Sequence, residues 1–348
     1  MEVSAPGRIC LFGEHQDYLG LPIIAMAITL RMHISGKKRK DNKVNIHLKD
    51  FGLNESFSLN DLQYLRTRDY FKSGFRTCIN EGLEYSNGFD VIIWSNIPIK
   101  AGVGSSSAMI VSWISFLSQM ADNAVVWTQE KIGQLAYQAE SLEFNEPGGM
   151  MDQYSSAIGG MIYLESDPKL SIKIMNPNIG NFVLGNSCEP KNTFEILNRC
   201  KDMRINIFEK LTKRNSNFDI HNQEKVDISF LSKGEQNIFK GTMKNRNILL
   251  KVLPELNKES PDPYFIGKYL LQHHEILRDV LNISTPKIEN MLDAALSAGA
   301  LGGKITGSGG GGCMFAYAPN NTQIVAEAIE RAGGKSFIIS SGKGASFG

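Results

Sequence analysis

Residues 98–108 read PIKAGVGSSSA and lead directly into a helical pattern that we expect over 106–120. Glycines let backbone N–H groups converge on a ligand, serines add hydroxyl donors, and the N-terminus of a helix carries partial positive charge. The pattern therefore favours an anion site suited to phosphate, with an ordinary serine-capped helix as the alternative. No GxxxxGK[ST] motif exists in the chain, which excludes a Walker A loop. The residues expected to bind the anion are Gly102, Val103, Gly104, Ser105, Ser106 and Ser107.

A second glycine-rich segment, GGKITGSGGGGC at 302–313, formally contains GxGxxG. A dinucleotide-binding fingerprint must open a helix, but the residues that follow, 314–317, predict a strand. We therefore expect a strand–loop–strand unit in which a ligand or another loop approaches the backbone closely. Four successive glycines lose much entropy on ordering, which favours a functional role for Gly309 and Gly310.

Near the N-terminus, GRICLFGEHQDY at 7–18 predicts a strand over 9–12 that ends at Gly13. Glu14, His15 and Asp17 would then lie together at the tip of that strand. This arrangement suits a ligand rich in hydroxyl groups. The alternatives are a solvated loop and, more weakly, a metal site.

The fourth segment is AESLEFNEPGGMMDQ at 139–153. Glu140 lies on a predicted helix, and Asp152 follows a Pro-Gly-Gly turn that would direct it into a cleft. Acidic groups close to an anion-binding helix suggest Mg²⁺–phosphate chemistry, whereas each carboxylate taken singly reads as a surface charge.

Strand and helix patterns alternate without a strict βαβ period, which predicts an α+β fold. Strands are expected over 9–12, 90–94, 161–164, 171–175 and 182–184, and helices over 106–120, 129–144, 265–281 and 286–298. The helix expected over 286–298 has a capping Thr285, an early Pro286 and a terminating Gly299. The length of 348 residues suggests two domains, and we expect 1–170 and 171–348.

Composition narrows the possible partners. Charges balance, with 37 Lys+Arg against 36 Asp+Glu, so no overall field favours nucleic acid or a membrane surface. Five scattered cysteines without a CxxC pair argue against a disulfide framework or thiolate zinc site. Without a signal-peptide or membrane-span pattern, we expect a cytoplasmic protein that is a monomer or weak dimer.

The four segments, in this order and spacing, resemble the GHMP kinases, the superfamily that includes galactokinase, homoserine kinase and mevalonate kinase. GEHxDY at 13–18 is similar to the sugar-binding signature of the galactokinase-like members, and AExxxF…PxGxMDQ at 139–153 to their metal and base segment. His273–His274 and the following approach to 302–313 also resemble that branch. The resemblance implies a two-domain architecture with the active site in the cleft between the domains.

It further implies an ATP-dependent sugar kinase that requires Mg²⁺. Asp152 would act on the attacking hydroxyl as general base or positioner, and Arg8 would keep it ionised and stabilise the transferring phosphoryl group. Glu140 would bind Mg²⁺ together with Ser106, with Ser105 and Ser107 as competitors. The sugar would be bound by Glu14, His15, Asp17 and Gly149, and ATP by the loop at 102–107 and by Gly309 and Gly310.

The acceptor is left open among galactose, related hexoses and sugar acids. The chain has Gln16, Leu19 and Leu21 where galactokinases usually read GEHTDYNGG, and residues 186–195 lack their Glu-Tyr and paired arginines. A sugar acid would need an extra cation, which the sequence does not identify. The alternatives are a mevalonate-type kinase, a catalytically silent sugar and ATP sensor, and an NAD(P)-binding oxidoreductase that rests on GxGxxG alone.

Overall fold

In the computed structural model, which describes residues 1–222 and 226–348, strands and helices form two layered units. The larger unit is an eight-stranded sheet in the order β12-β1-β2-β5-β3-β4, with β6 and β7 attached beside β2. Only the β3–β5 pairing is parallel among its strand pairs in the described residues. Its strands are β1 (Glu2–Phe12), β2 (Ile23–Lys38), β3 (Lys43–Leu48), β4 (Leu53–Ser58), β5 (Phe89–Ser95), β6 (Met161–Glu165), β7 (Ser171–Met175) and β12 (Ser346–Phe347).

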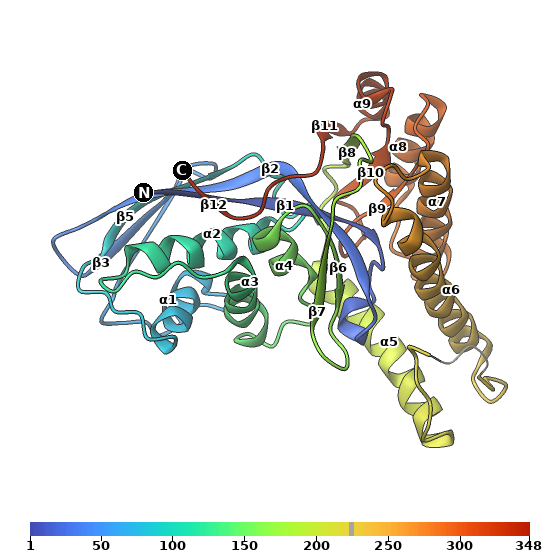
Figure 1. The fold of residues 1–348 in the computed structure, drawn as a ribbon, viewed down its shortest axis with the longest axis horizontal. Coiled ribbons are helices and arrows are strands. Elements are labelled where there is room, and N and C mark those ends of the chain that lie inside the picture. The colour runs from blue at the N-terminus through green and yellow to red at the C-terminus, as the bar shows by residue number, and fades with distance from the viewer. Residues whose placement is uncertain (223–225) are drawn as a thin grey trace.

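Helices α1 to α4 cover one face of this sheet, as Figure 1 shows. The central helix α2 is apolar on nearly all sides. Its Trp113 and Phe116 make edge-to-face contacts with Phe75 and Phe89 in a fully buried aromatic cluster. The helices are α1 (Tyr70–Asn80), α2 (Ser105–Met120), α3 (Gln129–Tyr137) and α4 (Met151–Ile158).

The smaller unit is a four-stranded antiparallel sheet in the order β11-β8-β10-β9. Helices α6 to α9 gather at this end of the molecule, away from α1 to α4 (Figure 1). Its elements are β8 (Phe182–Asn186), α6 (Lys233–Leu256), α7 (Pro263–Asp279), α8 (Pro286–Ser297), β9 (Gly302–Ile305), β10 (Cys313–Tyr317), α9 (Thr322–Arg331) and β11 (Lys335–Ile339), and α5 (Thr193–Arg214) extends beside it.

The predicted elements form, with shifted ends. The helix expected over 286–298 is α8: Thr285 Oγ1 accepts a hydrogen bond from the Ile288 amide, and Gly299 has a φ of 97°. The strand–loop–strand expected around 302–317 is the antiparallel pair β9–β10. The single helix expected over 129–144 instead changes at Gln138 into a π-helical turn, Gln138–Leu142.

The large sheet crosses the domain boundary expected between residues 170 and 171. β6 and β7 lie on opposite sides of that position but pair with each other, and β12 from the end of the chain pairs with β1. The sheet therefore recruits strands from beyond residue 170, and a division at that position stays a prediction.

Candidate active site

A cavity of about 510 Å³ lies where the end of β1, the start of α2, the π-helical turn and the loop after β9 meet. Twelve of the side chains and glycines expected at the site line it. They are Arg8, Glu14, His15, Asp17, Gly102, Gly104, Ser105, Ser106, Ser107, Glu140, Gly149 and Asp152.

Arg8 and Asp152 form a bidentate ion pair in this cleft. Arg8 Nε and Nη2 donate to the two carboxylate oxygens at 2.7 and 2.6 Å, and Nη1 donates to the carbonyl of Gly102 at 2.6 Å. Burial opposes the charge on Arg8, but the carboxylates of Asp152 and Glu14 raise its pKa above the usual value. One guanidinium therefore links Asp152, the expected base, to the loop at 98–108, which is expected to bind phosphate and is called the phosphate loop below.

Glu140 lies in the π-helical turn, beside the first turn of α2. The Ser106 and Ser107 side chains hydrogen-bond to its carboxylate, and Gln153 Nε2 donates to it at 2.7 Å. Burial raises the pKa of Glu140, and the nearby charge of Asp152 adds to this effect. A buried carboxylate beside hydroxyl oxygens matches the donors that Mg²⁺ takes in phosphate sites, so the residues fit the metal.

Two glycine loops press directly against each other at the entrance to α2. A Cβ on Gly307 would lie 2.4 Å from the carbonyl oxygen of Gly102, and the Cys313 amide donates to the Ala101 carbonyl at 2.8 Å. Gly104 takes the position before α2 with a φ of 73°, so the serines lie inside the first turn and do not cap the helix. The contact brings the segments at 98–108 and 302–313 to one cleft.

Asp17 lines the same cavity and packs on Gly149. A Cβ at residue 149 would lie 2.2 Å from Asp17 Oδ2, so only glycine allows this approach. Burial, followed by the nearby charge of Asp152, raises the pKa of Asp17 to about 6. Asp17 and Asp152 therefore form a pair of carboxylates in one cavity.

Glu14 and His15 also line the cavity, but protein partners already hold their polar atoms. Lys304 Nζ donates to Glu14 Oε2 at 2.7 Å, and both side chains are almost fully buried. His15 Nε2 is 3.2 Å from the Ser308 carbonyl, so it must donate there, and Nδ1 then accepts from the Tyr18 hydroxyl at 2.9 Å. Burial and the charge of Arg204 lower the pKa of His15 to about 3, which keeps the ring neutral. Their direct contact with a substrate stays a prediction.

Three residues expected to bind ATP lie outside the cavity lining. Val103 is buried and its carbonyl accepts from the Arg8 amide at 3.0 Å. Gly309 packs on Ile283, and the Gly310 amide donates to the Ile283 carbonyl at 2.7 Å. Loop closure onto a nucleotide by Gly309 and Gly310 therefore remains a prediction.

The histidine pair does not reach the cleft. His273 stacks on Phe12, and His274 Nε2 lies 2.9 Å from Glu289. These contacts pack α7 against neighbouring elements.

Several lining residues were missed from the sequence. Apolar side chains from several separate segments line part of the cleft. Lys191, just before α5, and Thr193, its first residue, also line it. The missed apolar residues include Leu48, Phe51, Phe71, Ile99 and Met109. Each belongs to an ordinary strand, loop or helix pattern, so no local signal distinguishes it from core.

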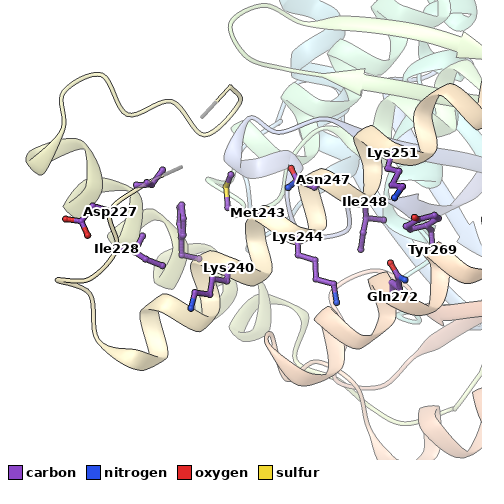
Figure 2. A pocket seen from close by; sticks show the side chains of 12 residues that line it. Asp227, Ile228, Lys240, Met243, Lys244, Asn247, Ile248, Lys251, Tyr269 and Gln272 are labelled. Atoms are coloured by element: carbon purple, nitrogen blue, oxygen red, sulfur yellow. The ribbon is translucent and has the colours of Figure 1, made fainter. Parts of the chain in front are cut away.

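A larger cavity, of about 950 Å³, lies between α6 and α7. Figure 2 shows Lys240, Lys244 and Lys251 along α6, with Tyr269 and Gln272 facing from α7. It contains none of the paired carboxylates or glycine loops. The candidate active site is therefore assigned by its chemistry and not by its size.

The fold and cleft define a kinase of the GHMP type, and sequence comparison agrees. The GHMP kinases N terminal domain matches residues 69–160, the GHMP kinases C terminal domain matches 253–346, and the galactokinase galactose-binding signature matches 1–38. The chain belongs to the GHMP kinase family, whose members are ATP-dependent kinases.

Individual relatives divide between two activities. The chain is 33% identical to the mevalonate kinase of Thermococcus gammatolerans, over 96% of its own length and 94% of the relative. Lactococcus lactis galactokinase complexed with galactose superposes with a TM-score of 0.83 at 19% identity, covering 99% and 94% of the two chains. The Methanococcus jannaschii mevalonate kinase superposes with a TM-score of 0.77 at 21% identity, covering 99% and 98%. The two structures establish the shared fold.

Within residues 1–222 and 226–348, no helix is long and apolar enough to cross a bilayer.

Proposed function

We propose that the protein transfers the γ-phosphoryl group of ATP to a hydroxyl of a sugar, with galactose, a related hexose or a sugar acid as the acceptor. The observation that carries the proposal is the pair of carboxylates in the cleft. Asp152 is held by Arg8 beside the phosphate loop, and Asp17 lies against Gly149 in the same cavity. Carboxylates that face a cavity are acceptors for hydroxyl donors, as a polyol supplies.

The residues divide the work of phosphoryl transfer, which depends on positioning and neutralisation of charge. Backbone N–H groups at 102–107 and the N-terminus of α2 bind the phosphates. The apolar side chains that line the cleft contact the nucleoside. Asp17 orients the acceptor. Asp152 accepts the proton of the attacking hydroxyl as the new O–P bond forms and the bond to ADP breaks. Arg8 contacts both Asp152 and the Gly102 carbonyl. From this position its charge stabilises the negative charge that develops on the transferring phosphoryl group.

Glu140 and Ser106 would hold Mg²⁺, with Ser107 as a competing ligand. The metal would neutralise phosphate oxygens when bound. Gln153 orients the Glu140 carboxylate through its 2.7 Å hydrogen bond, which leaves the remaining oxygen sites of that carboxylate for a cation.

A mevalonate-type kinase is the second candidate, because the relatives of about 33% identity carry that name. Mevalonate presents its own carboxylate. At Asp17 an acceptor of this kind would meet a like charge, which disfavours it at that end of the cavity. A sugar presents hydroxyl groups that can donate hydrogen bonds to the Asp17 carboxylate.

The test measures ADP release with Mg²⁺-ATP and a panel of acceptors. The panel holds galactose, N-acetylgalactosamine, galacturonate, glucose, mannose, fucose, arabinose, mevalonate and homoserine. Turnover with one sugar, lost in Asp17→Asn, supports the proposal. Turnover with mevalonate alone, retained in Asp17→Asn, would establish the second candidate. Absence of turnover across the panel, with ATP still bound, would favour a silent sensor.

A further inference from the structure

Lys191 is a cation without a partner inside the cleft. It belongs to the short segment between β8 and α5, and it lines the cavity with the expected catalytic residues. Its Nζ is shielded from solvent and makes no hydrogen bond within residues 1–222 and 226–348. A buried ammonium without a partner is costly, and burial lowers the pKa of Lys191 to about 8.

The neighbouring carboxylates do not neutralise Lys191, because each is already paired with another cation. Asp152 is bound by Arg8 at 2.6 Å, and Glu14 is bound by Lys304 at 2.7 Å. Both carboxylates act on Lys191 only through longer-range attraction. Among the described residues, the Lys191 ammonium is therefore left without a direct counter-ion in the cleft, and an anion from outside would satisfy it.

The position of Nζ indicates which anion. A Cβ on Gly102 would lie 2.6 Å from Nζ, so the ammonium lies over the first glycine of the phosphate loop. The carbonyl of that same glycine accepts from Arg8 Nη1. Lys191 and Arg8 thus flank one residue of the loop, and Asp152 is on the far side of Arg8.

We propose that Lys191 donates a hydrogen bond from Nζ to the γ-phosphoryl group of ATP and follows that group to the acceptor. Its charge neutralises the equatorial oxygens that carry negative charge in the transition state. The acceptor oxygen bonds to phosphorus, the bond from phosphorus to the ADP oxygen breaks, and Asp152 takes the hydroxyl proton. Lys191 keeps its own proton throughout. The inference depends on the ATP-dependent kinase activity of the family and not on the identity of the acceptor.

Binding measurements with Mg²⁺-ADP and the non-hydrolysable Mg²⁺-AMPPNP test the contact without any acceptor. Lys191→Met should weaken AMPPNP by about 10-fold or more and change ADP by less than about threefold, since only AMPPNP carries the γ-group. Lys191→Arg should recover most of the AMPPNP affinity. Lys213→Met, which removes an exposed lysine at the end of α5, is the matched control and should bind both nucleotides normally.

Two further readouts separate this role from a structural one. Lys191→Met should be at least as stable to heat as the wild type, because Nζ makes no hydrogen bond. At pH 8, AMPPNP binding to the wild type should take up about half a proton, as the pKa of Lys191 rises toward its usual value, and Lys191→Met should lose that uptake. Calorimetry in buffers of different ionisation enthalpy measures it. The other groups facing Lys191 are Cys313, Arg8, Glu14, Asp152 and His15.

Equal weakening of ADP and AMPPNP in Lys191→Met would overturn the proposal, because it would place Nζ on the α- or β-phosphate. Unchanged binding of both nucleotides would also overturn it. If KM for a carboxylate acceptor then rose while neutral sugars were unaffected, Nζ would be the cation for a sugar acid instead. A loss of thermal stability in Lys191→Met would contradict the proposal and show that Lys191 stabilises the folded protein.

Discussion

Asp152, the proposed base, makes a bidentate contact with Arg8. Asp152→Asn keeps the shape of the side chain but removes the negative charge that, in the proposed function, accepts the hydroxyl proton. We expect kcat to fall by about 10²- to 10⁴-fold while the Kd for Mg²⁺-ATP stays within a few-fold. Steady-state ADP release and nucleotide titration measure the two quantities, and full activity in this variant would contradict the role of Asp152 as base.

The fold holds the Asp17 carboxylate at a cost in stability. Its pKa of about 6 lies above the usual value near 4, so the folded protein binds this proton more tightly than the unfolded chain. The destabilisation is complete above about pH 6 and disappears as the pH falls toward 4. Asp17→Asn should therefore raise the free energy of unfolding by on the order of 1–2 kcal/mol at pH 7.5 and by almost nothing at pH 4.

Under the proposed function, the same substitution should abolish turnover of a sugar acceptor, because it removes the carboxylate proposed to orient that acceptor. In the wild type, kcat/KM for the acceptor should decline as the pH falls through about 6. Urea denaturation at the two pH values and a pH–rate profile check these outcomes. A variant that is equally destabilised at both pH values would show that Asp17 has a structural role only.

At the scale of elements, the loops at 98–104 and 306–312 contact each other directly, and this contact shapes the proposed phosphate site. Gly307→Ala would place a Cβ 2.4 Å from the Gly102 oxygen in a residue with a φ of 76°. We expect a loss of about 2–4 kcal/mol of stability and at least about 10-fold weaker Mg²⁺-ATP binding.

Gly52 provides the matched control for this substitution. It also has a positive φ, of 62°, but in the β3–β4 turn no atom lies within 4 Å of the position that a Cβ would take. Gly52→Ala therefore carries only the backbone cost of about 1 kcal/mol and should bind ATP normally. Equal losses in the two variants would show that close packing of the loops is unimportant.

The elements themselves follow local patterns to different degrees. α8 was predicted with its cap and terminator because those signals lie in adjacent residues. α5 was not predicted, because a mostly polar composition hides its one buried stripe of Cys200, Arg204, Ile207 and Leu211. The π-helical turn at Gln138–Leu142 has no sequence signal of its own, although it positions Glu140.

At the scale of the whole molecule, a buried ion pair joins Glu14, which follows β1, to Lys304 in β9 of the small sheet. Lys304 Nζ donates to Glu14 and to the Ile305 carbonyl, and the Lys304 side chain is fully buried. Lys304→Met should cost about 3–5 kcal/mol, because it leaves the Glu14 carboxylate buried without a cation.

Neutralising both partners tests this assignment. The double variant Lys304→Met/Glu14→Gln should be more stable than Lys304→Met, since no unpaired charge remains. Chemical denaturation of the wild type, the two single variants and the double variant gives the coupling energy. Strictly additive losses would contradict a direct pairing of the two charges.

The sequence alone determined the α+β class, the membership of a kinase family and the set of polar residues that meet in the cleft. The fold class and most of these polar residues depend on short segments: glycine loops, helix starts and a strand end, each of which has a local physical cause. Asp17, Glu140 and Asp152 were singled out in such segments, whereas Arg8 was predicted from the resemblance to the GHMP kinases, and all four line one cavity.

Only the tertiary structure decided which partners those residues contact. It paired Glu14 with Lys304, engaged both nitrogens of His15, and brought β7 and β12 into the large sheet. It also placed Lys191 over Gly102 without a partner. Such pairings join residues that are far apart in the chain, as Glu14 and Lys304 are at a separation of 290 positions, and burial and competition between charges decide them only after the chain has folded.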